Sequence, residues 1–151
     1  MALTTTIPTM TRDHVHATAS PVWRVGAMAT ITGAAVTELF SLAARALDVP
    51  MRAADPGASA AKDIPVGGFA MAVLMWAVVG TVLAVVFARR AKAPAHTFAT
   101  TAVVLTALSL LGPVFATHTE VSTKVVLLVA HLIAAAVVIP PLTTRLRHVE
   151  R

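Results

Sequence analysis

Four long apolar stretches, each bounded by charged or histidine residues, dominate the pattern of this sequence. Each has 20 or more residues, enough for an α-helix to cross the roughly 30 Å hydrocarbon core of a bilayer. Because unpaired backbone groups are not tolerated in lipid, we expect all four to be helices. The apolar cores are residues 25–44, 64–88, 97–117 and 125–144, and the predicted spans are about 22–46, 64–88, 97–117 and 121–142.

The predicted fold class is therefore an all-α membrane protein, with four transmembrane helices in one bundle over residues 22–144. Residues 1–21 are polar and rich in threonine, without the apolar run of a signal peptide, and we interpret them as a disordered cytoplasmic tail. Residues 145–151 are interpreted as a basic cytoplasmic tail.

Basic residues in the flanks predict the orientation in the membrane. The side that holds both termini and residues 89–96 carries eight of them, against four on the other side. We therefore expect both termini to be cytoplasmic, in a multi-pass protein of the plasma membrane whose partner is the anionic inner leaflet. The eight are Arg12, Arg24, Arg89, Arg90, Lys92, Arg145, Arg147 and Arg151, and the four are Arg45, Arg52, Lys62 and Lys124.

The composition excludes several classes of protein. Hydrophobic residues occupy 57% of positions and charged residues 13%, whereas about a quarter of a soluble domain is charged. Without cysteine there is no disulfide, no thiol redox chemistry and no cysteine-ligated metal. The net charge of +5 has no soluble basic domain to carry it, so we expect no nucleic-acid partner. We also expect no cofactor.

Small residues at helical spacing predict which helix faces point inward, because they let backbones approach closely in lipid. The first span carries Gly26, Thr30 and Ala34 at intervals of four residues, followed by Glu38. In the second span the same spacing joins Gly68, Ala72, Trp76, Gly80, Ala84 and Ala88. Glu38 and Trp76 are therefore expected to face the interior of the bundle.

Glu38 and His131 are the ionisable residues inside the four apolar cores. Each lies seven residues inside the basic residue at the outer end of its span, so both are about 10 Å deep. A carboxylate near the bilayer centre costs about 2.5–3.5 kcal/mol, and such residues are candidates for function by default. Neighbouring helices would bring the two together, either as a catalytic acid–base pair or as a structural hydrogen bond worth about 0.6 kcal/mol.

Four further residues complete the predicted ligand-binding set: Trp76, Ser109, Thr37 and His118. Trp76, at the centre of its span, either fills a gap or forms the wall of a pocket for a flat apolar ligand. A metal site at His118 and Glu120 is rejected, because Glu38 and His131 lie about 10 Å deeper and could not complete one coordination sphere.

Short motifs in the spans resemble those of small actinobacterial integral membrane proteins with four spans and no assigned activity. The resemblance covers roughly residues 22–147 and implies a four-helix membrane domain with a shared place for His131, Ser109 and Pro113, but no reaction. The resemblance also implies that members of this family more often carry a neutral polar residue where this chain has Glu38. Glu38 would then mark a specialised member. The motifs are Leu-Asp-Val-Pro at 47–50, Ile-Pro-Val-Gly at 64–67, Leu-Ser-Leu-Leu-Gly-Pro at 108–113, His-Leu at 131–132 and Ile-Pro at 139–140.

Three functional hypotheses follow. The first is a polar pocket in the outer half for a lipophilic small molecule, with Glu38 and His131 catalysing an isomerisation or cyclisation by acid–base chemistry. The second is a proton-coupled exporter that works as a homodimer. The third is a structural or accessory membrane subunit in which Glu38 and His131 hold helices together. The sequence favours the first and excludes none.

Overall fold

The computed structural model describes residues 20–54 and 58–150, which form four long helices and two short strands. The helices are α1 (Val22–Ala46), α2 (Gly68–Arg90), α3 (Pro94–Phe115) and α4 (Val121–Val149), and each is long and apolar enough to cross a membrane. The all-α four-span prediction is confirmed. Most of the predicted N-terminal tail, residues 1–19, lies outside the described part of the chain.

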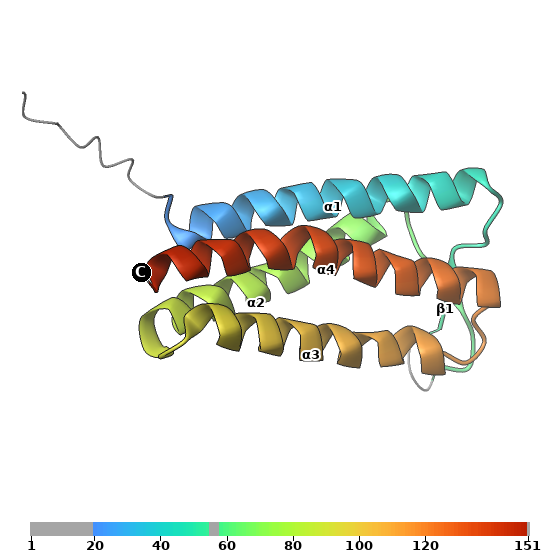
Figure 1. The fold of residues 1–151 in the computed structure, drawn as a ribbon. Helices are drawn as coiled ribbons and strands as arrows, with labels where there is room; N and C mark the ends of the chain where they lie inside the picture. The colour runs from blue at the N-terminus through green and yellow to red at the C-terminus, as the bar shows by residue number, and fades with distance from the viewer. Residues whose placement is uncertain (1–19, 55–57, 151) are drawn as a thin grey trace, which may run out of the picture.

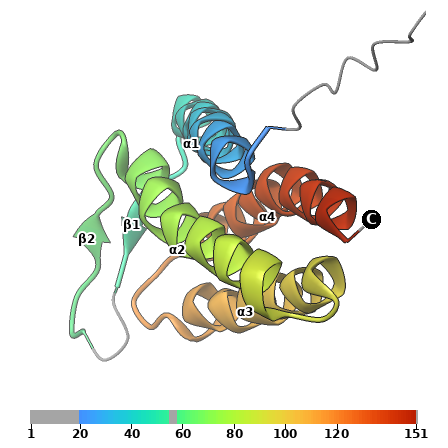
Figure 2. The ribbon, with the colours of Figure 1, turned by 90° about the vertical axis from the view of Figure 1, so that its left-hand side faces the viewer.

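The four helices run up and down in one bundle (Figure 1). Helix α1 packs against α2 and α4, whereas α3 packs mainly against α4. The end-on view shows α1 and α3 on opposite sides, with α2 and α4 between them (Figure 2). Helix α1 begins and α4 ends at the same end of the bundle, which we call the inner end, and the opposite end is the outer end.

Helix boundaries follow the backbone chemistry of the flanking residues. Helix α2 begins at Gly68, later than its apolar stretch, because Pro65 and the left-handed Gly67 (φ 85°) interrupt the chain. Helix α4 continues to Val149, so part of the expected basic tail is helical. Leu142 and Leu146 are fully buried there against Ala95 and Phe98 of α3, which explains the extension.

The α1 face predicted from small residues is confirmed. Gly26, Thr30 and Ala34 are all buried. A β-carbon built on Gly26 would lie 2.4 Å from the methyl carbon of Thr81, so α1 and α2 touch at this point. Thr81 is also fixed, because its hydroxyl donates a hydrogen bond to the Ala77 carbonyl at 2.8 Å.

The described parts of the segment that joins α1 to α2, residues 47–54 and 58–67, are held against the outer end of the bundle. Strand β1 (Arg52–Ala53) pairs antiparallel with β2 (Lys62–Asp63), and Arg52 Nε lies 3.0 Å from the carboxylate of Asp63. The Ala54 amide donates to the Thr119 hydroxyl at 3.0 Å, just before α4. Met51 is buried with Phe69 in a cluster that closes the outer end of the bundle.

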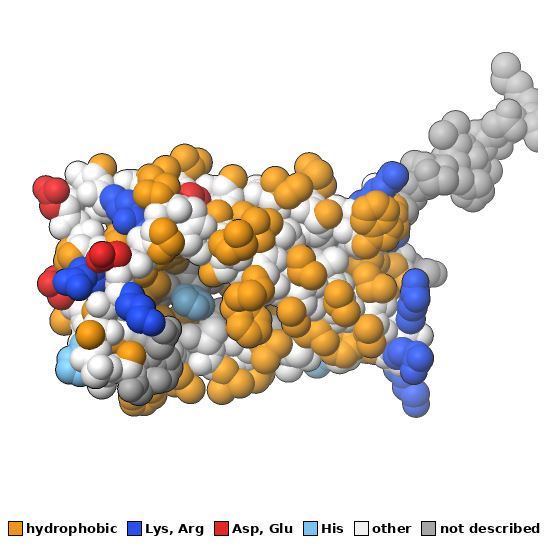
Figure 3. Space-filling model, turned by 180° about the vertical axis from the view of Figure 1, so that it is seen from behind, with side chains coloured by type: hydrophobic (Ala, Val, Ile, Leu, Met, Phe, Trp, Pro, Cys, Tyr) orange, Lys and Arg blue, Asp and Glu red, His pale blue; other side chains and the backbone are white. Residues whose placement is uncertain are grey.

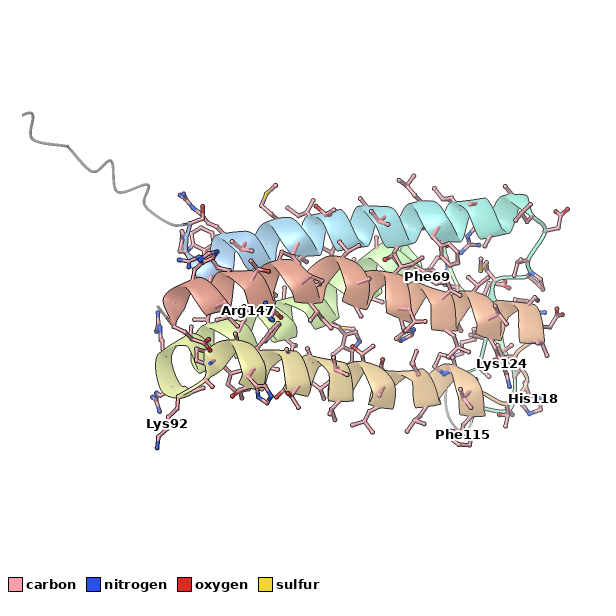
Figure 4. All side chains as sticks on the ribbon, viewed as in Figure 1. Phe69, Lys92, Phe115, His118, Lys124 and Arg147 are labelled. Carbon is pink, nitrogen blue, oxygen red and sulfur yellow. The ribbon has the colours of Figure 1, made fainter. Side chains whose placement is uncertain are left out.

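Charged side chains gather at the two ends and leave an apolar band between them (Figure 3). On the face shown, the inner end carries lysine and arginine, whereas the outer end carries charges of both signs. Lys92 and Arg147 mark the inner end, and His118 and Lys124 mark the outer end (Figure 4). This division matches the charge pattern of a membrane-spanning bundle.

The close contact of α1 with α2 predicts a sharp difference between two glycines. Gly26→Ala should lower the stability of the detergent-solubilised protein by about 1–3 kcal/mol, because the new methyl group meets a fixed threonine. Gly80→Ala is the matched control, since no neighbouring atom of the described residues lies within 4 Å of the place that its new methyl group would occupy. Thermal unfolding measures both, and equal melting temperatures for the two variants would contradict the packing described here.

Candidate functional site

Glu38 binds the N-terminus of a neighbouring helix. Its Oε1 accepts a hydrogen bond from the Gly67 amide at 2.8 Å, and its Oε2 accepts one from the Ala70 amide at 3.0 Å. Gly67 is the N-cap residue of α2 and Ala70 is its third residue. These two amides are the ones that a capping box satisfies within one helix, and here a single carboxylate on α1 satisfies both.

The sequence around α2 explains why the cap comes from outside. Ser, Thr, Asp and Asn are the usual N-cap residues, but position 67 is a glycine and has no side chain to accept a hydrogen bond. The N-terminus of a helix also carries a partial positive charge, which favours a carboxylate beside it. Glu38 therefore supplies both the acceptor atoms and the negative charge that α2 lacks.

Arg45 binds the same segment from the other direction. Its Nη2 donates to the carbonyls of Ile64, at 2.6 Å, and Pro65, at 3.3 Å. Arg45 lies two helical turns after Glu38, so both side chains project toward the start of α2. We call Glu38, Arg45 and residues 64–70 the α1–α2 clamp, because α1 holds both carbonyls and amides of this segment.

His131 does not pair with Glu38 in the described structure. Its Nδ1 lies 2.7 Å from the Leu127 carbonyl, one turn earlier on α4. Since a carbonyl only accepts, Nδ1 carries the proton, and in the neutral ring Nε2 is an acceptor. Glu38 instead accepts hydrogen bonds from α2, because the first amides of α2 have no partners within that helix.

Two hydroxyl groups on α1 are buried without a hydrogen-bond partner among the described residues. Thr37 is 2% exposed and Ser41 is 0% exposed. They lie one turn apart on the inward face of α1, next to the α1–α2 clamp. Thr37 was predicted as a ligand-binding residue, whereas Ser41 and Arg45 were not. Thr37, Ser41 and Arg45 follow one another at intervals of four residues, and this spacing is the signal that could have identified them.

The remaining predicted residues lie elsewhere. The expectation that Trp76 fills a gap or walls a pocket is wrong, because its side chain is 68% exposed on the outside of the bundle. Ala84 of the predicted stripe is buried, but Ala72 and Trp76 of the stripe are exposed. The other buried positions of α2 are Phe69 and Ala77, so its inward face follows the stripe only in part. Ser109 is exposed on α3 and donates to the Thr106 carbonyl at 2.7 Å.

His118 is exposed in the turn between α3 and α4, at the outer end of the bundle (Figure 4). Its backbone is left-handed, with φ 53°. Within residues 20–54 and 58–150, no three His, Cys, Asp or Glu side chains come together as a metal site would require.

The four lipid-compatible helices and the apolar band define a multi-pass membrane protein. The chain belongs to the family of unknown function DUF6069, whose family model matches residues 17–148. The expectation of a family without an assigned activity is thus confirmed. No curated protein and no solved structure matches the chain.

The geometry of the α1–α2 clamp predicts that Glu38→Gln destabilises the bundle. A glutamine amide has one acceptor oxygen, so one of the two α2 amides would face another donor. We expect a loss of about 2 kcal/mol, typical of a hydrogen bond to a charged group. Thermal unfolding in detergent measures it.

Glu120→Gln is the matched control for this experiment. Glu120 is exposed at the start of α4 and makes no capping hydrogen bond with the described residues, so its replacement should cost only about 0.3–1 kcal/mol, the contribution of a negative charge near a helix N-terminus. A Glu38→Gln variant as stable as Glu120→Gln would rule out a structural role for the carboxylate.

Proposed function

We propose that this chain is a structural or accessory membrane subunit, in which Glu38 holds the bundle together instead of reacting with a substrate. The observation that carries the proposal is that both oxygens of Glu38 accept backbone hydrogen bonds from α2. This is the arrangement of an ionised carboxylate that acts as an acceptor. A catalytic acid is expected to direct an oxygen at its substrate, whereas both oxygens of Glu38 are directed at the backbone of α2.

The proposed setting is the plasma membrane, with both termini in the cytoplasm. Support comes from the excess of basic residues at the inner end and the mixed charges at the outer end. The partners in this setting are the anionic inner leaflet and other membrane chains, including a second copy of this one. The alanine-rich composition, with more arginine than lysine, supports an actinobacterial origin.

A polar pocket for a lipophilic small molecule is the second candidate function. It is favoured by the unpartnered hydroxyls of Thr37 and Ser41, which are buried beside Glu38. The apolar face in Figure 3 is also hollowed, with a histidine side chain in the hollow. A ligand with one polar group would satisfy the hydroxyls, and Glu38 and His131 would be its acid–base pair.

Native mass spectrometry in mild detergent distinguishes the two candidates. It compares the wild-type chain with Glu38→Gln, His131→Ala and the control Glu120→Gln. For a structural subunit, we expect no small-molecule mass that depends on Glu38 and His131, together with reduced stability of Glu38→Gln. A lipophilic molecule bound to the wild type and Glu120→Gln, but absent from both other variants, would overturn the structural proposal and support the pocket. The same spectra report whether the chain forms a dimer.

A further inference from the structure

A groove of about 480 Å³ runs between α1 and α4 at the inner end of the bundle. Its α1 side is formed by residues one turn apart, from Arg24 through Met28 to Thr32, and its α4 side by Val137 and Pro141. The two helices lie side by side here (Figures 1 and 2). The groove is thus largely apolar and runs along the direction of lipid acyl chains. The guanidinium of Arg24 lies near one end of it.

Two guanidinium groups stand at the inner end of this groove. Arg24 is an exposed residue that lines the groove, and its Cζ lies 5.4 Å from the ring centre of Trp23. Arg145 of α4 donates through Nε to the carbonyl of Ser20, another lining residue. Trp23 is exposed and belongs to the residue type that prefers the level of lipid headgroups, so it marks the depth of both cations.

The spacing between α1 and α4 changes along the two helices, and this explains why the groove is open. The adjacent close contact is at Gly33, where a β-carbon would lie 3.0 Å from a methyl carbon of Val138. Toward the inner end, α4 contains Pro140 and Pro141, which cannot donate to the carbonyls four residues earlier and which bend helices. A close approach followed by a double proline leaves space between α1 and α4 that the side chains of residues 20–54 and 58–150 do not fill.

We infer that this groove binds one anionic phospholipid of the surrounding leaflet, with its phosphate at Arg24 and an acyl chain along α1 and α4. The apolar walls fit an acyl chain, and the guanidinium forms charge-assisted hydrogen bonds with a phosphate. Basic pockets between membrane helices at the cytoplasmic side are a recognised type of anionic lipid site. The inference rests on the proposed cytoplasmic orientation of the inner end, but not on the proposed role of Glu38, because Glu38 and His131 take no part in it.

The test titrates the full chain in mild detergent with phosphatidylglycerol or with phosphatidylcholine of the same acyl chains, and counts bound lipids by native mass spectrometry. The wild type should retain one phosphatidylglycerol in preference to phosphatidylcholine. Arg24→Gln should weaken that retention about fivefold, as expected for one basic group near the surface. Arg90→Gln is the matched control: it removes the same charge from the same end, and Arg90 does not line the groove.

A second variant tests the acyl-chain part of the site. Thr32 is exposed at the membrane side of the groove, so Thr32→Phe fills the groove without disturbing the bundle. We expect this variant to lose the retained phosphatidylglycerol although it keeps Arg24. Unchanged retention in Thr32→Phe, an equal loss in Arg24→Gln and Arg90→Gln, or equal retention of both lipids would each overturn the inference. Failure would leave the role of Glu38 untouched.

Discussion

Helix N-termini inside a bilayer leave amide groups without partners, and this constraint shapes the bundle. In water such amides are solvated, but in hydrocarbon each unsatisfied group costs several kcal/mol. Helix α2 starts with two glycines and offers no side chain for capping. Glu38 of α1 satisfies two of the amides, with hydrogen bonds of 2.8 and 3.0 Å. Placing a carboxylate in the membrane costs about 2.5–3.5 kcal/mol, and two hydrogen bonds of about 1.5–3 kcal/mol each offset that cost.

A second glutamate accepts a hydrogen bond from the first turn of a neighbouring helix at the inner end of the bundle. Glu150, directly after α4, accepts a hydrogen bond through Oε1 from the Ala95 amide at 2.8 Å. Ala95 lies in the first turn of α3, whose N-cap is an alanine without a capping side chain. Two glutamates thus connect α1 to α2 and α4 to α3. Small residues such as Gly26 and Gly33 let the helices approach closely, and clusters around Phe69 and Leu142 fill the two ends of the bundle.

Large apolar side chains of this protein mostly face outward, as expected where lipid is the solvent. Trp76, Leu39 and Met28 are all more than half exposed. The fully buried side chains include the hydroxyl residues Thr37, Ser41 and Thr123 beside Leu142 and Leu146, so the interior combines hydroxyl groups with apolar packing. The two halves of the bundle therefore differ. The outer half contains the buried hydroxyls of Thr37 and Ser41, and the inner half carries an apolar groove with Arg24 near its end.

The sequence predicted the four helices, since length and apolarity decide what crosses a membrane. It also predicted the inward face of α1, because glycine, alanine and threonine recur there at helical spacing. It could not predict the partner of Glu38, because a side-chain pairing of His131 with Glu38 and a capping contact with α2 are equally compatible with the sequence pattern. The error at Trp76 has a similar cause: α2 is apolar all round, so spacing alone does not define its buried face.

Amide hydrogen exchange at α2 tests the role of Glu38 most directly. Residue-resolved NMR in detergent micelles would compare the wild type with Glu38→Ala. The amides of Gly67 and Ala70 should be protected in the wild type and lose protection in the variant. The Met71 amide is an internal control, because it donates to the Gly67 carbonyl at 2.9 Å and should stay protected in both. Equal protection of Gly67 and Ala70 in the two proteins would contradict the capping of α2 by Glu38.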